Sequence, residues 1–342
     1  MRKWNCLFLV FILLAFLKVP QAACGEEPIK LKMADFFPIG HISYKNSLVF
    51  IKWVHEATHG KVAIEYYPAE QIGKLKDLLH LCSQGVADIA FVPPSFYAGT
   101  LPLNTVTQLP YWTTALEGAR VYRWVMAACP ELSQELMRYS VRPLVVTSIS
   151  QYDVGTVKKR VRSPEDLKNL KLKTSGGLFD KIAKQYGIVP VVVPSPEIYE
   201  ATQRGIIDGN ILSFPSVKGY RVNELEKYHT LGLRMGGYPC LWTINEKKWQ
   251  KIPEDLQKAL LKVAEKFSDY SANSWDEEQV NLAQQFEKEG MVIYRSPRED
   301  RAKWEAPLKG IEEIWMQDME KKGLSARKVY AEFNRICGEV VR

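Results

Sequence analysis

The sequence predicts an α/β protein of two lobes connected by one long helix. The chain has 342 residues, more than one domain usually holds, and its hydrophobic (46%) and charged (25%) fractions are those of a globular protein. Strand-like and helical runs alternate in two separate stretches, which is typical of sheets with helical crossovers. Residues 254–289 contain neither Gly nor Pro, and a helix of that length measures about 55 Å. It exceeds one lobe, so it either kinks near Asn273 and Ser274 or crosses both lobes.

The first lobe is predicted from alternating elements near the start of the chain. We expect strands at 29–33, 62–67 and 88–92, with helices at 41–59 and 75–83. This order implies a parallel sheet, and ligands of such sheets bind beyond the carboxyl ends of the strands. The loops at 36–41 and 93–97 are therefore candidate binding segments.

The second lobe is predicted from a similar alternation that begins near residue 144. Two matching helix starts, at Ser163 and at Ser195, each place Ser, Pro and Glu where an N-cap, a first turn and the positive helix end favour them. The remaining expected elements are strands at 144–149, 171–174, 189–193 and 206–209 and a helix at 177–186. Asp208 and Gly209 are expected to form a structural turn, and residues after 297 read as helical with a break at Gly323.

Residues 1–23 have the order of a secretory signal peptide. Arg2 and Lys3 precede an apolar run at 6–17, and small residues follow at 22–23. The apolar run is too short to cross a bilayer comfortably, although an uncleaved anchor stays an alternative. Cys24 stands where a lipid anchor would attach, which is a second alternative. We therefore expect an exported protein.

Charge and cysteine content exclude two other classes. The net charge is +7, but three of the excess positive charges lie within residues 1–23, and no basic stripe or recognition motif appears in the rest. Nucleic acid is therefore not an expected partner. The six cysteines include no CxxC pair, so a disulfide framework or a zinc finger is not predicted, while a single bridge stays open.

One motif suggests an enzyme. His55, Glu56 and His59 match HExxH, in which two His one helical turn apart bind zinc and Glu activates water. Gly60 ends the predicted helix beside His59, so the two imidazoles would not share a rigid face. We favour two exposed polar residues near a helix end, and a secreted zinc metalloenzyme stays the alternative function. No other catalytic, metal or cofactor motif is predicted.

Four segments, found in order along the chain, resemble one family. They are 69–112 (AEQIGKLKDLLHLCSQGVADIAFVPPSFYAGTLPLNTVTQLPYW), 161–173 (VRSPEDLKNLKLK), 196–209 (PEIYEATQRGIIDG) and 244–260 (INEKKWQKIPEDLQKAL). The chain is similar to the solute-binding proteins of tripartite ATP-independent periplasmic (TRAP) transporters, dicarboxylate-binding type. The resemblance implies a type II-like periplasmic binding protein with a long helix spanning both lobes. It implies lobe I at 24–150 plus 241–272 and lobe II at 151–240 plus 273–342.

The same resemblance implies a non-enzymatic periplasmic receptor without a cofactor. It would capture a small organic anion in the interlobe cleft and deliver it to the small and large membrane subunits of a TRAP permease. A ligand sensor that works without a permease is a further alternative.

The expected binding residues depart from the family pattern. Lys173 stands where the family usually has an Arg that clamps a carboxylate, and an ammonium does not replace a bidentate guanidinium equivalently. Either Lys173, with Arg234, binds the carboxylate of a larger and more apolar acid, or the ligand is not a simple carboxylate and Asp153 meets a cation. We favour the first explanation.

Other candidates come from loops that the resemblance places at the cleft. Binding sites favour aromatic and convergent polar side chains. The predicted ligand-binding set therefore adds Phe37, His41, Pro94, Tyr97, Leu212, Ser213 and Phe214. Phe36 and Tyr111 are further aromatic candidates, whereas Trp275 is expected in the core.

Overall fold

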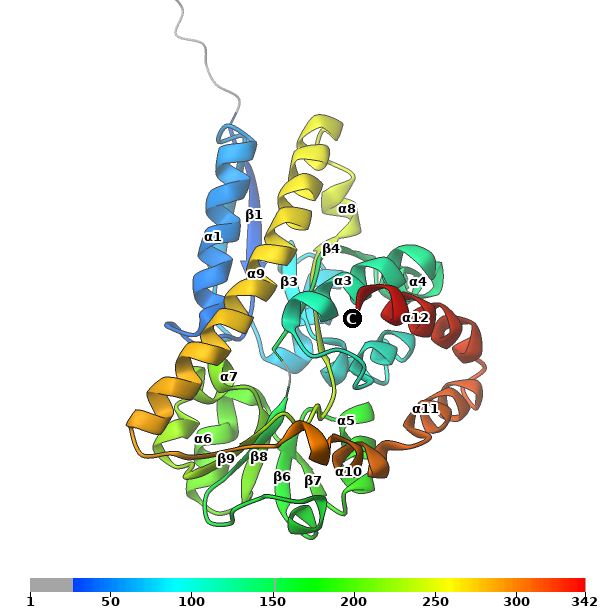
Figure 1. The fold of residues 1–342 in the computed structure, drawn as a ribbon. Helices are drawn as coiled ribbons and strands as arrows, with labels where there is room; N and C mark the ends of the chain where they lie inside the picture. The colour runs from blue at the N-terminus through cyan, green and yellow to red at the C-terminus, as the bar shows by residue number, and fades with distance from the viewer. Residues whose placement is uncertain (1–26, 151, 342) are drawn as a thin grey trace, which may run out of the picture.

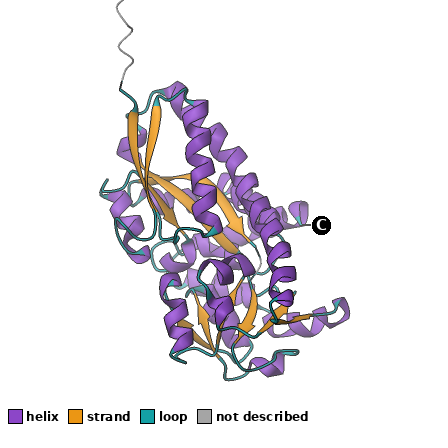
Figure 2. Cartoon of the chain, turned by 90° about the vertical axis from the view of Figure 1, so that its left-hand side faces the viewer, coloured by secondary structure: helices purple, strands orange, loops and turns teal. Residues whose placement is uncertain are grey.

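The computed structural model describes residues 27–150 and 152–341 and contains two mixed β-sheets, one in each lobe (Figures 1 and 2). The predicted signal peptide and Cys24 lie outside the described residues. The first sheet has five strands in the order β2 (Val62–Tyr67), β1 (Ile29–Ala34), β3 (Ile89–Val92), β10 (Tyr238–Asn245) and β4 (Val141–Ile149). Strand β1 is parallel to β2 and β3, whereas β10 is antiparallel to β3 and β4. The predicted parallel pairing of the first strands is thus confirmed. Strand β10, which follows the second lobe in the sequence, returns to this sheet between β3 and β4.

The second sheet has six strands and the same mixed character. Their order is β11 (Val292–Arg295), β9 (Tyr228–Leu231), β5 (Asp153–Thr156), β8 (Gly209–Leu212), β6 (Lys171–Thr174) and β7 (Val189–Val192). Strand β5 is antiparallel to β8 and β9, and β6 is parallel to β7 and β8.

Helices cover both sheets. Those of the first lobe are α1 (Ile42–Ala57), α2 (Leu78–Ser83), α3 (Ala115–Ala128), α4 (Pro130–Met137) and α8 (Glu246–Trp249). Those of the second are α5 (Leu178–Gln185), α6 (Ile198–Gln203), α7 (Phe214–Gly219) and α10 (Arg301–Glu305). Helices α11 (Ile311–Glu320) and α12 (Ala326–Val340) complete the chain, with Gly323 between them as expected. No helix within the described ranges is long and apolar enough to span a membrane.

The long helix α9 (Glu254–Lys288) is continuous and contacts both lobes (Figure 1). It packs on α1, α3 and β4 of the first lobe and on α7 and β11 of the second. The predicted weak point does not break it, because the Ser274 hydroxyl bonds to the Ser271 carbonyl at 2.9 Å and accepts a hydrogen bond from Asn46 of α1 at 2.8 Å. Of the two expected forms, the structure has the one that crosses both lobes.

The two lobes are also joined by chain crossings. One runs from β4 to β5 and another from β9 to β10. After β11 the chain returns, so that α12 lies against α3 of the first lobe (Figure 1). The lobe boundaries given above stay a proposal, to which this packing adds that α12 accompanies the first lobe.

One strand prediction is wrong in its bounds. The strand expected at 206–209 begins only at Gly209, because the Asp208 carboxylate accepts a hydrogen bond from the Lys171 amide and Gly209 passes so close to β5 that a Cβ would lie 2.1 Å from the Gly155 carbonyl oxygen. The two expected helix starts are present in different forms: Ser163 makes a capping box with Asp166 on the 3-10 turn Pro164–Leu167, and the 3-10 turn Ser195–Glu197 leads directly into α6, without a capping hydrogen bond from the Ser195 side chain.

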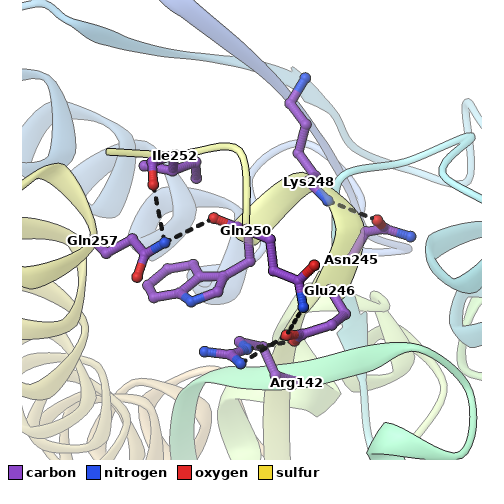
Figure 3. A network of polar contacts seen from close by, with 8 residues as sticks. Arg142, Asn245, Glu246, Lys248, Gln250, Ile252 and Gln257 are labelled. Carbon is purple, nitrogen blue, oxygen red and sulfur yellow. Dashed lines mark hydrogen bonds and ion pairs between the residues drawn. The ribbon is translucent and has the colours of Figure 1, made fainter. Parts of the chain in front are cut away.

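A polar network fixes the end of β10 in the first lobe (Figure 3). Arg142 of β4 makes two hydrogen bonds to Glu246, at 2.6 and 2.8 Å, and Gln250 donates to the same carboxylate. Gln257 of α9 donates to the carbonyls of Trp249 and Ile252, both at 2.9 Å. The network anchors the start of α9 to the first sheet.

Candidate functional site

A narrow cavity lies between the lobes, beyond the carboxyl ends of strands from both sheets. Its walls come from lobe I, lobe II and α9: Phe36, Phe37, Phe91, Ile149, Tyr152, Ser195, Leu212, Ser216, Tyr220, Tyr238, Cys240 and Trp275. In this closed arrangement the space holds about one water molecule. A ligand larger than water can therefore enter only when the lobes or their side chains separate.

The aromatic wall on the lobe I side is held by Asp35. This residue follows β1, and its buried carboxylate accepts the Phe37 amide at 3.1 Å and the Tyr66 hydroxyl at 2.5 Å. Burial raises the pKa of Asp35 to about 7, and the hydrogen bonds from Tyr66, Phe37 and Ser47 oppose that rise. The loop after β1 is thus pinned so that Phe36 and Phe37, with ring centroids 4.4 Å apart, face the cavity.

His41 joins this wall to the second lobe. Its ring stacks on Phe37 at 4.7 Å and lies 5.1 Å from Tyr220 and 5.7 Å from Trp275. The imidazole is buried, which lowers its pKa to about 3, so the ring is neutral. Its Nδ1 accepts the Ser43 amide at 3.0 Å, which assigns the ring proton to Nε2. Gly219 of α7 leaves room for the ring, since a Cβ there would lie 1.9 Å from it.

Lys173 is the only lysine or arginine that is buried among the described residues. It lies at the end of β6, where its Nζ donates to the Ser175 hydroxyl at 3.2 Å and sits 5.7 Å from the Phe96 ring centroid. No carboxylate of a described residue lies within ion-pair distance of it. Desolvation by burial lowers the pKa of Lys173 to about 7.

Lys173 is not part of the cavity wall, but hydroxyl groups lie between it and the cavity. The Tyr238 hydroxyl faces Ser95 and Ser175, and the Ser95 hydroxyl is buried without a hydrogen-bond partner. Tyr238 lines the cavity, with its ring 5.0 Å from that of Tyr152. A carboxylate that displaced Tyr238 slightly would therefore meet one ammonium and several hydroxyl donors.

More hydroxyl groups surround the lobe II side of the cavity. The Tyr152 hydroxyl faces Ser216, and that of Tyr220 faces Ser195. Burial raises the pKa of both phenols, so they remain neutral donors. The cavity thus combines aromatic faces with neutral hydroxyl groups and contains no charged wall residue.

Asp153 is held by hydrogen bonds within the second lobe. Its Oδ1 accepts the amides of Gly232 and Leu233 at 2.9 and 3.0 Å, which fixes the start of the crossing from β9 to β10. Burial raises the pKa of Asp153 to about 6, opposed first by the charge of His229. The hypothesis that it meets a cationic ligand stays a prediction.

The other predicted residues lie at different distances from the cavity. Phe37 and Leu212 line it, and Ser213 is buried beside Leu212 with an unpartnered hydroxyl. Phe214 packs instead on His229 and Phe286 inside lobe II, with centroids 4.2 and 5.3 Å away. The Tyr97 hydroxyl donates a hydrogen bond to the Leu75 carbonyl.

Pro94 and Arg234 are not grouped with Lys173 by any described contact. Pro94 is buried at the first turn of the short helix Pro94–Tyr97. Arg234 is half-buried, with φ of 53°, on the crossing from β9 to β10. Desolvation lowers its pKa, and its charged neighbours are Arg301, Glu305 and Glu117. Their roles in binding stay predictions.

The HExxH residues do not form a metalloprotease helix. Helix α1 ends at Ala57, and His59 follows in a left-handed backbone conformation with φ of 50°. His55 and His59 therefore do not share a helical face. Within the described ranges, no group of three His, Cys, Asp or Glu side chains is arranged to hold a metal ion.

Several site residues were missed by reasoning from the sequence. Tyr152, Tyr220, Tyr238 and the serines that face them come from six separate segments, and only the closed fold brings them together. Trp275 was expected in the core but also forms part of the cavity wall. Ser195 offered no usable signal, because its position predicts a helix N-cap and only the structure shows that its side chain makes no capping hydrogen bond.

Comparisons with known proteins agree with this architecture. The family model for bacterial extracellular solute-binding protein, family 7 (DctP), matches residues 33–321. A solute-binding protein of Albidiferax ferrireducens is 25% identical over 339 residues, which cover 96% of this chain and 94% of that protein.

Solved structures of TRAP solute-binding proteins share the fold. One from Rhodoferax ferrireducens T118, in complex with copurified benzoate, has a TM-score of 0.85 at 22% identity and covers 91% of this chain and 98% of that chain. One from Bordetella bronchiseptica, with bound (R)- and (S)-mandelate, has a TM-score of 0.82 at 19% identity and covers 91% and 99%.

The expected two-lobed fold with its crossing helix is thereby confirmed. The match to the family model covers most of the chain. The chain therefore belongs to the DctP family of extracellular solute-binding proteins, the receptors of TRAP transporters, and is a binding protein rather than an enzyme.

Proposed function

We propose that this receptor captures one small aromatic monocarboxylate between its lobes, with Lys173 as the partner of the carboxylate. The observation that carries the proposal is a buried lysine without a carboxylate partner, connected by hydroxyl groups to an aromatic cavity. An organic acid supplies what this arrangement lacks, namely one negative charge and an apolar body.

The number of cations in the site favours a single carboxylate. Charges are stable in a protein interior only when they are paired or solvated. The cavity wall contains no Arg, Lys or second cation, so the second carboxylate of a dicarboxylate would be buried without a partner. The four aromatic rings of Phe36, Phe37, Phe91 and Trp275 instead suit a flat apolar ring.

The similar structures support the same ligand class. Benzoate and mandelate, held by the two receptors named above, each combine one carboxylate with one aromatic ring. Lys173 replaces the family's usual Arg, so the site offers one compact ammonium charge instead of the paired donors of a guanidinium. A monocarboxylate can bind such an ammonium through one oxygen.

Delivery to a permease is the second part of the proposal. The protein is a periplasmic receptor, and we propose that residues 1–23 export it. Small and large membrane subunits of a TRAP permease would then recognise its closed, loaded form. Transport in membrane vesicles tests this part: uptake that needs both the permease and the receptor supports it, whereas a receptor that leaves uptake unchanged favours the sensor alternative.

A thermal-shift screen tests the ligand class. The panel contains benzoate, 3-hydroxybenzoate and mandelate, with succinate and malate as dicarboxylates and zinc chloride as a separate arm. A ligand at 100 times its dissociation constant stabilises the fold by about 2.7 kcal/mol, so at least one aromatic acid should raise the melting temperature clearly. Stabilisation by succinate or zinc alone would contradict the proposal.

Substitution of Lys173 tests the assigned residue. We expect Lys173→Met to weaken binding of the best aromatic acid at least tenfold, about 1.4 kcal/mol, as measured by calorimetry. Lys171→Met is the matched control, because Lys171 lies on the same strand but is exposed, and it should leave the affinity unchanged. Equal affinities for the two variants would remove Lys173 from the site.

A further inference from the structure

We propose that His41 of lobe I and Gly219 of lobe II form a closure contact: the imidazole occupies the space beside Gly219 only when the lobes close on a ligand, and a side chain at 219 would keep them apart. This inference rests on the proposed function, in which the lobes close on a bound acid, and adds the residue pair that permits closure. Both residues have a positioning role, since neither belongs to the cavity wall.

The His41 ring is held in place by lobe I alone. His41 is the N-cap of α1, and its Nδ1 accepts the Ser43 amide at 3.0 Å. Phe37 stacks on the ring with centroids 4.7 Å apart, and the Phe37 amide is in turn held by Asp35. The direction of the ring is therefore set without any contact from lobe II.

The space for the ring on lobe II exists because residue 219 has no side chain. Gly219 is the last residue of α7, and a Cβ there would lie 1.9 Å from Cδ2 of His41. The backbone does not require glycine at this position, because the left-handed residue after α7 is Arg221, with φ of 60°. Glycine in a helix is less stable than alanine, so the missing side chain, rather than the backbone, accounts for glycine here.

The ring has no room to turn away from an added methyl group. His41 is only 1% exposed, and the rings of Tyr220 and Trp275 lie 5.1 and 5.7 Å from it. Packed interiors do not admit an extra carbon atom without displacing their neighbours. Alanine at 219 should therefore stop lobe II before it reaches the closed position.

The closure contact is connected to the ligand cavity through three wall residues. Phe37, Tyr220 and Trp275 contact the His41 ring and also line the cavity. Tyr220 follows Gly219 directly in the chain. A lobe II that is held back at residue 219 therefore also holds Tyr220 away from the ligand, and binding becomes weaker.

One polar group makes closure depend on the ligand. Nε2 of His41 carries the ring proton and is buried without a hydrogen-bond partner among the described residues. Water can bond to this N–H when the lobes are apart, and closure removes that water at a cost. The closure contact therefore limits how the lobes fit together, while the energy that stabilises the closed form comes from the ligand.

Gly219→Ala tests the inference, with benzoate as the probe. We expect calorimetry to show binding weakened at least about tenfold, because the added Cβ prevents full closure. With saturating benzoate, small-angle X-ray scattering should show contraction of the wild type and a larger radius of gyration for Gly219→Ala. Wild-type affinity and full contraction of Gly219→Ala would overturn the inference.

Gly338→Ala is the matched control. Gly338 also lies in a helix, α12, and nothing lies within 4 Å of a Cβ added there. This variant should bind benzoate with wild-type affinity and contract like the wild type.

His41→Asn separates the closure contact from other effects of an alanine at 219. Asparagine can still cap α1 but lacks the ring. In this background Gly219→Ala should change the affinity by less than about twofold, because the atom that its Cβ would meet is gone. An equal loss of affinity in the two backgrounds would overturn the inference.

Urea unfolding of the ligand-free protein tests the inference without a ligand. If the closure contact forms only on ligand binding, Gly219→Ala should be at least as stable as the wild type, like Gly338→Ala, since alanine favours helix. A loss of stability confined to Gly219→Ala would show that His41 meets residue 219 in the empty protein and would overturn the inference. Absence of binding by every acid in the panel would instead refute the proposed ligand class, and this comparison would still decide the inference.

Discussion

At the scale of single residues, the proposed binding site depends on Lys173. The sequence could identify it, because the resemblance marks the end of strand 171–174 as a cationic position. The sequence could not show its burial or its hydroxyl neighbours, because Ser95, Ser175 and Tyr238 come from different segments. Local patterns report on one face of one element, whereas the polarity of a cavity depends on all elements around it.

At the scale of elements, the sequence predicted helices and strands more accurately than it predicted the residues of the site. Strands at 62–67 and 171–174 were predicted with their observed bounds, because apolar alternation and short loops determine them locally. The strand at 206–209 was placed three residues early, since its true start depends on pairing with β5, which is distant in sequence. The continuity of α9 likewise depends on tertiary contacts with α1.

Asp276 shows how α9 organises the first lobe. Its carboxylate accepts the free amides of Ala115 and Leu116 at the start of α3, at 2.8 and 3.1 Å. We expect Asp276→Ala to cost roughly 1–2 kcal/mol of stability, the usual value for a lost N-terminal cap. Thermal or urea unfolding measures it.

The neighbouring Glu277 offers the control. It is exposed on the same helix, so Glu277→Ala should change the stability by less than about 0.5 kcal/mol. An equal loss in the two variants would attribute the effect to helix α9 itself rather than to the cap on α3.

At the scale of the whole molecule, length and alternation predicted two lobes, and the structure has them. The cleft is so narrow in this arrangement that about one water fits. The lobes must therefore move apart to admit an aromatic acid, and binding energy can stabilise the closed state. Interlobe contacts such as the stacked Phe37 and His41 against Tyr220 would form on closure.

Small-angle X-ray scattering should detect this movement. We expect the ligand-free protein to have a larger radius of gyration than the closed structure and to contract when saturating benzoate is added. Succinate at the same concentration serves as the control. An unchanged radius with bound benzoate would mean that the lobes do not close on the ligand.

In the proposed complex, one buried lysine between two lobes pairs with the carboxylate of an aromatic acid. A crystal structure with bound benzoate would show this pairing. We expect a carboxylate oxygen within about 3.2 Å of Lys173 Nζ and the ring among Phe36, Phe37 and Trp275. A carboxylate paired with Arg234 instead, or a ligand bound outside the interlobe cavity, would contradict it.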